Sequence, residues 1–381
     1  MTNIKVVIGC SFGDCGKGLM TDYFCNKATL DGNCVVVLSN GGCQRSHTVT
    51  TPDGKRHAFR HFGSGTFAGA DTYYPKQFIV NPMFFKDEYL ELKGLGYEPI
   101  AYIHPDCMFT TPFDMIINQL AEEHRGDDRH GSCGMGIWET IVRDGMTAYA
   151  FSKLPVDIQV NYLCYIRDIY LSKRLKELGI NDVNDEWKDI INSKALMLNY
   201  IQDFNWMVEH VEFEFEDILI GYDNVVFENG QGLLLDQNIE GYGEHTTPSN
   251  TGIKNPLEII NSAFEEGEYN LEVCYVTRSY MTRHGAGRFD TECRKEDINP
   301  DMEDLTNVPN PHQGTLRYGW LDFEDLVDRV KNDSKGVKGF ISLAVTHQNE
   351  YKLKMNSNLL KDIFLIYESD GHDRSSVTCA M

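Results

Sequence analysis

The sequence predicts an α/β protein with one large central sheet, mostly parallel and flanked by helices. Three observations predict it. Short runs of apolar and β-branched residues recur along the chain and are continuous rather than alternating, which is typical of strands buried on both faces. Charged segments with helical periodicity lie between them, as in βα units. The first strand leads directly into a glycine-rich loop and a helix, a P-loop-like order that suits phosphate binding.

The elements follow in chain order. Residues 4–9 are predicted as the first strand, 9–18 as the glycine-rich loop and 19–27 as a helix. Further strands are predicted at 35–38, 78–80, 100–103, 225–227, 273–276, 339–345 and 363–367. Residues 40–48 are expected to form a polar loop, and 299–311, rich in Asn, Asp and Pro, a long surface loop. About 155–220 is expected to be a helical insertion within a single domain spanning 1–381.

Composition limits the partners. The formal net charge is −22, so the chain should repel nucleic acid and anionic membranes. No run of about 18 apolar residues is present, which argues against a membrane span, and residues 1–9 do not resemble a signal peptide. The 11 cysteines are scattered without zinc-ligand spacing. We therefore expect a soluble, cytoplasmic protein with reduced thiols.

The strongest local signal is Gly9-Cys-Ser-Phe-Gly-Asp-Cys-Gly-Lys-Gly18. Glycines let backbone amides surround phosphate oxygens, and Lys17 adds a positive charge. The loop is not a Walker A motif, because Ser11 stands where a glycine is required and Gly18 where Ser or Thr would bind magnesium. This disfavours a P-loop GTPase switch. Asp14 could supply the missing metal ligand, and the alternative is a tight turn with a solvated lysine.

Gly-Asp-x-Gly-Lys-Gly after a first strand resembles the signature loop of the adenylosuccinate synthetase family. The resemblance implies that Asp14 removes the proton from N1 of a purine and binds magnesium, while Lys17 contacts phosphates. Residues 40–48 resemble the family's Gly-Gly-x-Asn-Ala-Gly-His-Thr segment. This implies that His47 hydrogen-bonds the purine 6-oxygen and the transferring phosphoryl group, and that the Ser46 carbonyl binds magnesium. On its residues alone, His47 could also be a surface histidine.

Further segments match the family in order. Residues 131–136 resemble a turn, Thr-Thr-Gly-Arg-Gly, that holds the nucleotide 5′-phosphate, with Ser132 and Cys133 standing for its two threonines. Arg143 fits an arginine that reaches into the neighbouring subunit, which implies a homodimer with shared active sites. Phe227-Glu-Asn-Gly-Gln-Gly-Leu-Leu-Leu-Asp236, residues 246–250, 282–292 and 319–322 match further motifs, and 369–374 resembles the segment that holds the donor base.

The resemblance thereby assigns the site, with Asp14, Lys17 and His47 as the catalytic residues. Donor-nucleotide residues are Gly13, Gly16, Lys17, Gly18, Thr48, Thr346, Ser369 and Gly371. Residues for the purine nucleoside monophosphate acceptor are Asp14, Gln44, Cys133, Arg143, Gln231, Thr247, His284 and Gly285. Amino-acid residues are Gly314, Thr315 and Arg317, and the Mg²⁺ ligands are Asp14 and Ser46.

The chain departs from the family pattern at three places. Residues 343–347 lack the carboxylate that reads guanine, so the donor is left open between GTP and ATP or dATP. Residues 311–318 keep only Arg317 of four arginines that clamp aspartate, and Arg283 or Arg288 would have to compensate. Arg45 replaces the alanine of the family segment; it would either add charge near the phosphates or point into solvent.

These patterns predict a ligase of purine nucleotide biosynthesis. A nucleoside triphosphate would phosphorylate O6 of IMP or dIMP, and L-aspartate would then displace phosphate to give N6-succinyl-AMP. The retained Asp14 favours hypoxanthine over guanine, since relatives that act on guanine tend to carry a small residue there. Three alternatives stay open: a 2-aminoadenylosuccinate synthetase acting on GMP or dGMP, a ligase for another amino acid, and a nucleotide-binding regulator that has lost catalysis.

Overall fold

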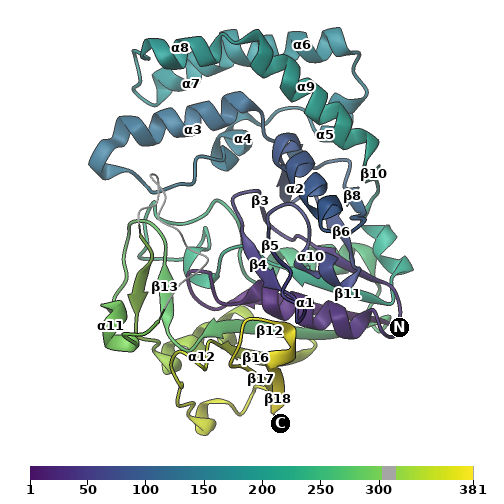
Figure 1. Ribbon diagram of the computed structural model, residues 1–381, viewed down its shortest axis with the longest axis vertical. Coiled ribbons are helices and arrows are strands. Elements are labelled where there is room, and N and C mark those ends of the chain that lie inside the picture. Colours follow the sequence, from purple (N-terminus) through teal and green to yellow (C-terminus); the bar gives the residue numbers. More distant parts are fainter. Residues whose placement is uncertain (303–314, 381) are drawn as a thin grey trace.

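The computed structural model describes residues 1–302 and 315–380. In this part of the chain, ten strands form one sheet, and all neighbouring strands pair in parallel except β17 and β18 (Figure 1). In spatial order they are β10 (Glu212–Phe213), β8 (Ala101–Ile103), β6 (Asp71–Tyr74), β2 (Cys34–Val37), β11 (Asn224–Glu228), β1 (Thr2–Gly9), β12 (Tyr269–Arg278), β16 (Phe340–Thr346), β17 (Leu365–Ser369) and β18 (Val377–Ala380). The predicted α/β class is confirmed.

Helices cover both faces of this sheet, which explains the continuous apolar strands. Along β2, Val35 and Val37 belong to one buried cluster and Val36 to the other. The cluster that contains Val36 packs against α1 (Lys17–Ala28) and α2 (Pro82–Gly94). The opposite cluster packs against α10 (Lys254–Ala263) and α12 (Phe323–Asp333). Every position of such a strand is buried, so polar residues cannot alternate with apolar ones.

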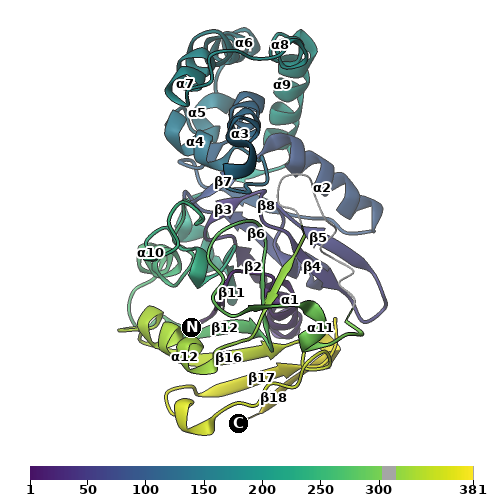
Figure 2. The ribbon, with the colours of Figure 1, turned by 90° about the vertical axis from the view of Figure 1, so that its left-hand side faces the viewer.

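A group of helices forms the end of the molecule opposite β16–β18 in both views (Figures 1 and 2). They are α3 (Pro112–Arg125), α4 (Ile137–Arg143), α5 (Ala148–Ser152), α6 (Val156–Tyr165), a π-helical turn (Ile166–Leu171), α7 (Ser172–Glu177), α8 (Asp185–Ile191) and α9 (Lys194–Glu209). The segment expected to be a helical insertion supplies α6–α9 and then returns to the sheet through β10. Within the described ranges, no helix is long and apolar enough to cross a membrane.

Short strands lie outside the main sheet and shape its carboxyl edge. β3 (Gly41–Gly42), β7 (Phe78–Val80) and β9 (Met108–Phe109) form one small sheet, and β4 (His47–Thr50) pairs with β5 (Arg56–Phe59). β13 (Met281–Arg283), β15 (Arg317–Gly319) and β14 (Glu292–Cys293) form another, and α11 (Lys295–Ile298) lies between β14 and β15 in the sequence. The expected polar loop at 40–48 is therefore wrong in part, because it contains β3 and enters β4, and its side chains are mostly buried.

Candidate active site

A cleft of about 930 Å³ opens between the glycine-rich loop and the group of helices. Its walls come from the loops after β1, β3 and β11, from the turn between α3 and α4, and from the residues after β13. Of the residues predicted from sequence, Gly13, Asp14, Lys17, Gln44, Ser46, His47, Cys133, Gln231, Thr247 and His284 line it together. Segments more than 250 residues apart in sequence thus meet at one surface, as is typical at the carboxyl edge of a parallel sheet.

The glycine-rich loop is held from behind by the neighbouring strands. Asp14 has a positive φ of 47°, a conformation that costs energy for a non-glycine residue. The loop keeps it because the guanidinium of Arg278 donates to the Asp14 carbonyl. One residue further on, the Thr346 hydroxyl donates to the Cys15 carbonyl at 3.0 Å. The Asp14 side chain is left facing the cleft.

The carboxylate of Asp14 meets an imidazole. Its Oδ2 lies 2.8 Å from Nε2 of His284, and each side chain is 29% exposed. Burial works to raise the pKa of Asp14, but the hydrogen bond and charge of His284, with Arg278 and Lys17, lower that pKa to about 2. Asp14 is therefore ionised at neutral pH. Its second oxygen, Oδ1, has no protein partner among residues 1–302 and 315–380.

Lys17 opens helix α1 and reaches back across the loop. Its Nζ donates to the carbonyl of Gln231 at 2.5 Å and lies 3.8 Å from the Cys15 sulfur. The side chain is buried, yet it lines the cleft. Gln231 itself has a positive φ of 56°, and its side-chain Oε1 accepts from Asn40 at 3.3 Å. A cation and an amide are thus fixed beside Asp14 at the loop that would receive phosphate.

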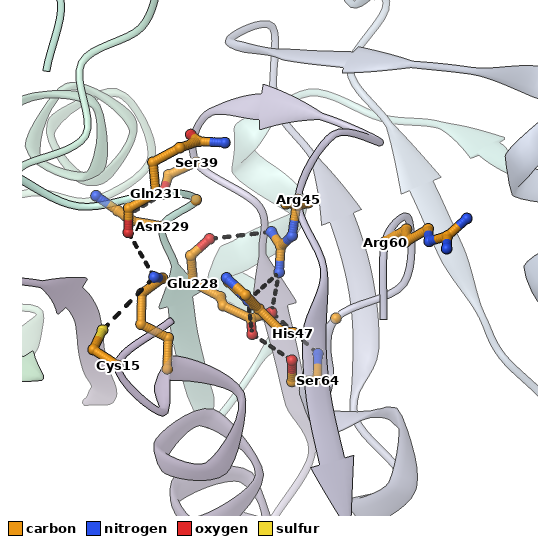
Figure 3. Close-up of polar contacts among 12 residues, drawn as sticks. Cys15, Ser39, Arg45, His47, Arg60, Ser64, Glu228, Asn229 and Gln231 are labelled. Atoms are coloured by element: carbon orange, nitrogen blue, oxygen red, sulfur yellow. Dashed lines mark hydrogen bonds and ion pairs between the residues drawn. The ribbon is translucent and has the colours of Figure 1, made fainter. Parts of the chain in front are cut away.

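His47 enters the cleft from β4 and is bound to a buried carboxylate (Figure 3). Its Nδ1 lies 2.7 Å from Oε1 of Glu228, whose Oε2 lies 2.5 Å from Nη2 of Arg45. Burial, and after it the charge of Arg45, lower the pKa of His47 to about 4. Burial opposes ionisation of Glu228, but Arg45 and His47 hold its pKa well below the usual range. The Arg45 side chain is 1% exposed, so the solvent-facing alternative for this residue is wrong.

The turn between α3 and α4 is organised by a carboxylate. Glu122 accepts hydrogen bonds from the backbone nitrogens of Gly131 and Ser132 at 2.8 and 3.2 Å. Asn118 donates to the Ser132 hydroxyl at 2.8 Å, so that hydroxyl is engaged within the protein. Cys133 lines the cleft, and Gly285 lies against Gly131 in the wall behind it.

Arg143 is placed elsewhere. Its guanidinium binds Asp114 at 2.9 Å and donates to the Tyr162 hydroxyl at 3.0 Å and the Phe109 carbonyl at 2.8 Å. The side chain is 4% exposed and does not line the cleft. Arg143 thereby joins α4 to α3, α6 and β9 within its own subunit, and its expected reach into a partner subunit stays a prediction.

The residues predicted for the donor nucleotide gather behind the glycine-rich loop. A Cβ on Gly16 would lie 2.8 Å from the Thr346 methyl group, and a Cβ on Gly18 3.1 Å from Cβ of His47. Ser369 is buried and donates to the Gly371 carbonyl at 3.0 Å. The hydroxyl of Thr48 is buried without a hydrogen-bond partner among the described residues. Gly16 follows β1, and Thr346 and Ser369 end β16 and β17 on the same half of the sheet, whereas Thr48 belongs to β4.

The amino-acid residues are placed only in part. Gly314 lies outside the described residues, and Thr315 is exposed. Arg317 binds Glu292 through two nitrogens, at 2.8 and 2.5 Å, and donates to the carbonyls of Gly285 and Gly287. Its fork is therefore already filled by a carboxylate of the same chain.

The two arginines that could compensate also have partners. Arg283 is 2% exposed and donates to the carbonyls of Ala286, Arg288 and His245. Burial, and then the charge of Arg317, lower the pKa of Arg283 to about 10. Arg288 pairs with Asp290 at the surface, at 2.5 Å.

A magnesium site fits Asp14 and Ser46 only as a sparse one. In the described ranges, no group of three or more His, Cys, Asp or Glu residues could hold a metal. Mg²⁺ is commonly bound by one or two carboxylates together with substrate phosphates. The free Oδ1 of Asp14, beside exposed Ser46 in the same cleft, suits that pattern.

Sequence reasoning missed the groups that hold the site in place. Glu228 directly follows the apolar run of a predicted buried strand in the Phe-Glu-Asn-Gly-Gln motif, and an acid at such a position needs a polar partner. Arg45 was visible as a charged residue in place of a small one, but its partner lies 183 residues away. Ser64 and Glu122 gave no signal, because isolated Ser and Glu residues are common on surfaces.

Comparison with known proteins identifies the family. The family model for adenylosuccinate synthetase matches residues 6–352. The chain is 28% identical over 362 residues to the adenylosuccinate synthetase of Clostridium beijerinckii, which covers 90% of this chain and 76% of the relative. It is 27% identical over 325 residues to that of Picrophilus torridus, covering 84% and 71%.

Two solved structures share the fold. A fully ligated adenylosuccinate synthetase from Plasmodium falciparum aligns with a TM-score of 0.72 at 16% identity, over 100% of both chains. The succinoaminodeoxyadenylate synthetase of cyanophage S-2L, bound to dGMP and to dATP as an energy donor, aligns with a TM-score of 0.62 at 13% identity, over 99% and 95%. With its family model spanning residues 6–352, this chain belongs to the adenylosuccinate synthetase family of carbon–nitrogen ligases.

Proposed function

We propose that this ligase joins L-aspartate to carbon 6 of IMP or dIMP, driven by a nucleoside triphosphate. One observation carries the proposal: Asp14, Lys17 and His47, from two separate loops, line one cleft together with Gln231. A carboxylate, an ammonium and an imidazole at one surface suit proton removal and phosphoryl transfer. The products would be N6-succinyl-AMP or its deoxy form, a nucleoside diphosphate and phosphate.

The chemistry proceeds in two steps. The Asp14 carboxylate, ionised because its pKa is about 2, accepts the N1 proton, and negative charge moves to O6 of the purine. O6 then attacks the γ-phosphorus of the donor and displaces the nucleoside diphosphate, while Lys17 stabilises the charge on the transferring group. In the second step, the amine of aspartate forms a bond to carbon 6, and the phosphorylated oxygen leaves as phosphate, which takes up the proton released by the amine. The residues act mainly by positioning and electrostatics.

The proposal includes Mg²⁺, held by Asp14 and the main chain of Ser46. When bound, the ion would neutralise charge on the donor phosphates. The proposal also includes a homodimer, which light scattering of the purified protein would test. Arg143 is left out of a shared site, because its guanidinium binds Asp114 within its own subunit.

The acceptor base is assigned from Asp14. A carboxylate at this position can accept from N1 of a 6-oxopurine, and the His284 ring on its other oxygen fills neighbouring space. Guanine also carries hydrogen on N1, so the discrimination comes from the occupied space beside Asp14, which favours hypoxanthine over guanine with its additional 2-amino group. The donor stays open between GTP and ATP or dATP, because residues 343–348 contain no carboxylate to accept from guanine N1 and N2.

The test is a matrix of substrates. The purified enzyme is incubated with IMP, dIMP, GMP or dGMP, each with ATP or GTP, Mg²⁺ and a mixture of amino acids, and the products are weighed by mass spectrometry. A succinyl adduct of IMP or dIMP with release of phosphate is expected. If product forms from dGMP alone, the acceptor is dGMP and not IMP or dIMP. An adduct of another mass would show that the amino acid is not aspartate. Nucleotide binding without any phosphate release would overturn catalysis in favour of a regulator.

A further inference from the structure

A polar cluster that includes His47 lies at the wall of the cleft, with its side chains almost entirely buried. It consists of Arg45, His47, Ser64 and Glu228, and Figure 3 shows their side chains pointing toward one another from β4, its preceding loop, a 3₁₀ turn (Ser64–Ala68) and the end of β11. The Arg45 and Glu228 side chains are 1% and 0% exposed. Such a buried ion pair is costly to desolvate, so its presence beside the cleft suggests a role other than stability.

The contacts of Glu228 use both of its oxygens. Oε1 is 2.7 Å from His47 Nδ1 and accepts from the Ser64 hydroxyl. Oε2 is 2.5 Å from Arg45 Nη2 and accepts from the Ser64 backbone nitrogen at 3.1 Å. Arg45 also donates to the Glu228 carbonyl at 3.3 Å. The carboxylate is thus held by four donors, and its position cannot drift without breaking several of them.

These contacts decide which ring nitrogen of His47 carries hydrogen. A carboxylate paired with a guanidinium is ionised and can only accept. The short approach of Nδ1 to Oε1 therefore requires the hydrogen on Nδ1. The Arg45 Nη2 lies 3.0 Å from the same Nδ1 but has Glu228 as its acceptor. The opposite edge of the ring, with Nε2, is left for the cleft that His47 lines.

We propose that Arg45 and Glu228 are positioning residues that fix the His47 imidazole as its Nδ1–H tautomer, with Nε2 directed into the cleft. Arg45 is the part of this device that the family segment does not predict, since a small residue is expected there. It supplies a positive charge that keeps the buried Glu228 carboxylate ionised. The inference rests on the proposed function only for its kinetic consequence; the tautomer and orientation are properties of the unliganded chain.

The kinetic test uses Glu228→Gln, Arg45→Met and the conservative Arg45→Lys. Loss of the group that orients a working imidazole costs about 10- to 100-fold or more in turnover. We expect kcat for the succinyl product to fall by at least tenfold in Glu228→Gln and Arg45→Met, with KM for both nucleotides within threefold. Arg45→Lys should recover part of kcat, because an ammonium can still pair with Glu228.

A matched control lies in the same protein. His104 and Glu216 form another buried imidazole–carboxylate pair, with Nε2 and Oε2 3.1 Å apart, and neither residue lines the cleft. Glu216→Gln should lower the melting temperature as Glu228→Gln does but leave kcat unchanged. If Arg45→Met and Glu228→Gln keep their kcat per folded molecule, the cluster is structural only and the proposal fails.

A spectroscopic arm does not depend on turnover. In the full-length protein labelled with ¹⁵N in histidine, with His47 assigned by comparison with His47→Gln, the Nδ1 of His47 should be protonated and Nε2 should not. Glu228→Gln should redistribute the hydrogen between the two nitrogens. A wild-type His47 with hydrogen on Nε2 would overturn the inference even if the enzyme is active, and the expected tautomer in an inactive protein would overturn only the proposed function.

Discussion

Gly9, the last residue of β1, lies where the glycine-rich loop approaches the loop that carries Gln231. A Cβ at this position would lie 2.8 Å from the Gln231 carbonyl oxygen, 3.1 Å from the Cys15 sulfur and 3.2 Å from the Lys17 ammonium. Ordinary van der Waals contact begins at 3.4 Å, so in Gly9→Ala the carbonyl has to move by about 0.6 Å. That carbonyl is the acceptor of Lys17 at 2.5 Å, so the ammonium moves with it.

Gly9→Ala should lower both the free energy of unfolding and kcat. Overpacking of this kind costs about 1–3 kcal/mol of unfolding free energy. Displacing a positioned cation by a fraction of an ångström should lower kcat by about 10- to 100-fold. Urea unfolding followed by circular dichroism measures the first quantity, and phosphate release under saturating substrates measures the second.

Gly94→Ala is the matched control. Gly94 is exposed at the end of α2, and a Cβ there would meet no atom within 4 Å. Alanine at this helical position should leave kcat unchanged and add up to about 1 kcal/mol of stability. If Gly9→Ala instead matches the wild type in both assays, then β1 and the loop carrying Gln231 are not in contact, and the geometry assigned to Lys17 is wrong.

Four further outcomes are expected. Asp14→Asn should lower kcat by about 100-fold or more, while the melting temperature changes little because the pair with His284 is partly exposed; a phosphate-release assay that finds turnover within threefold of wild type would remove Asp14 from the mechanism. The pKa of His47 is about 4 in the folded protein and lies below its unfolded value, so the unfolded chain binds more protons between about pH 4 and 6.5. The free energy of unfolding should therefore fall as the pH drops through that window, by on the order of 3 kcal/mol relative to His47→Gln. Parallel urea titrations of the two proteins check this, and an equal dependence of unfolding free energy on pH in both would contradict it. Arg143→Met leaves the Asp114 carboxylate buried and unpaired, which should cost about 3–5 kcal/mol of stability without raising KM for the acceptor nucleotide; a raised KM would restore Arg143 to a shared site. EDTA should stop turnover reversibly but leave the melting temperature unchanged, and a large fall in that temperature would indicate a structural metal.

Much of the fold could be predicted, because strands buried on both faces of the sheet have continuous apolar sequences. Val35-Val36-Val37 is continuous since its residues alternate between two apolar clusters. The signal fails for short elements that other segments complete. β6 begins at Asp71, whose carboxylate accepts from the Tyr222 hydroxyl at 2.5 Å across the chain, and β4 pairs with β5 through residues that look like a polar loop.

The candidate site shows the same division. Asp14, Lys17 and His47 could be singled out because local motifs carry them, and the structure brings them to one cleft. The partners that fix these groups could not, since each lies far away in sequence: Thr346 and Cys15 are separated by 331 positions, and Arg45 and Glu228 by 183. Arg143 shows the converse, because a motif assigns it to the acceptor site while its guanidinium binds Asp114, Tyr162 and the Phe109 carbonyl within its own subunit.

The place of β1 at the middle of the sheet has a consequence for synthesis of the chain. β1 pairs with β11 and β12, and the register joins Asn3 to Asn224, 221 positions later. At about 5–20 residues per second, roughly 10–40 s pass on the ribosome before the first of these partners emerges. Until then the apolar strand β1 lacks both of its neighbours in the sheet, so nascent chains should engage a chaperone that holds extended apolar segments, and truncation before β11 should yield aggregates rather than a stable intermediate.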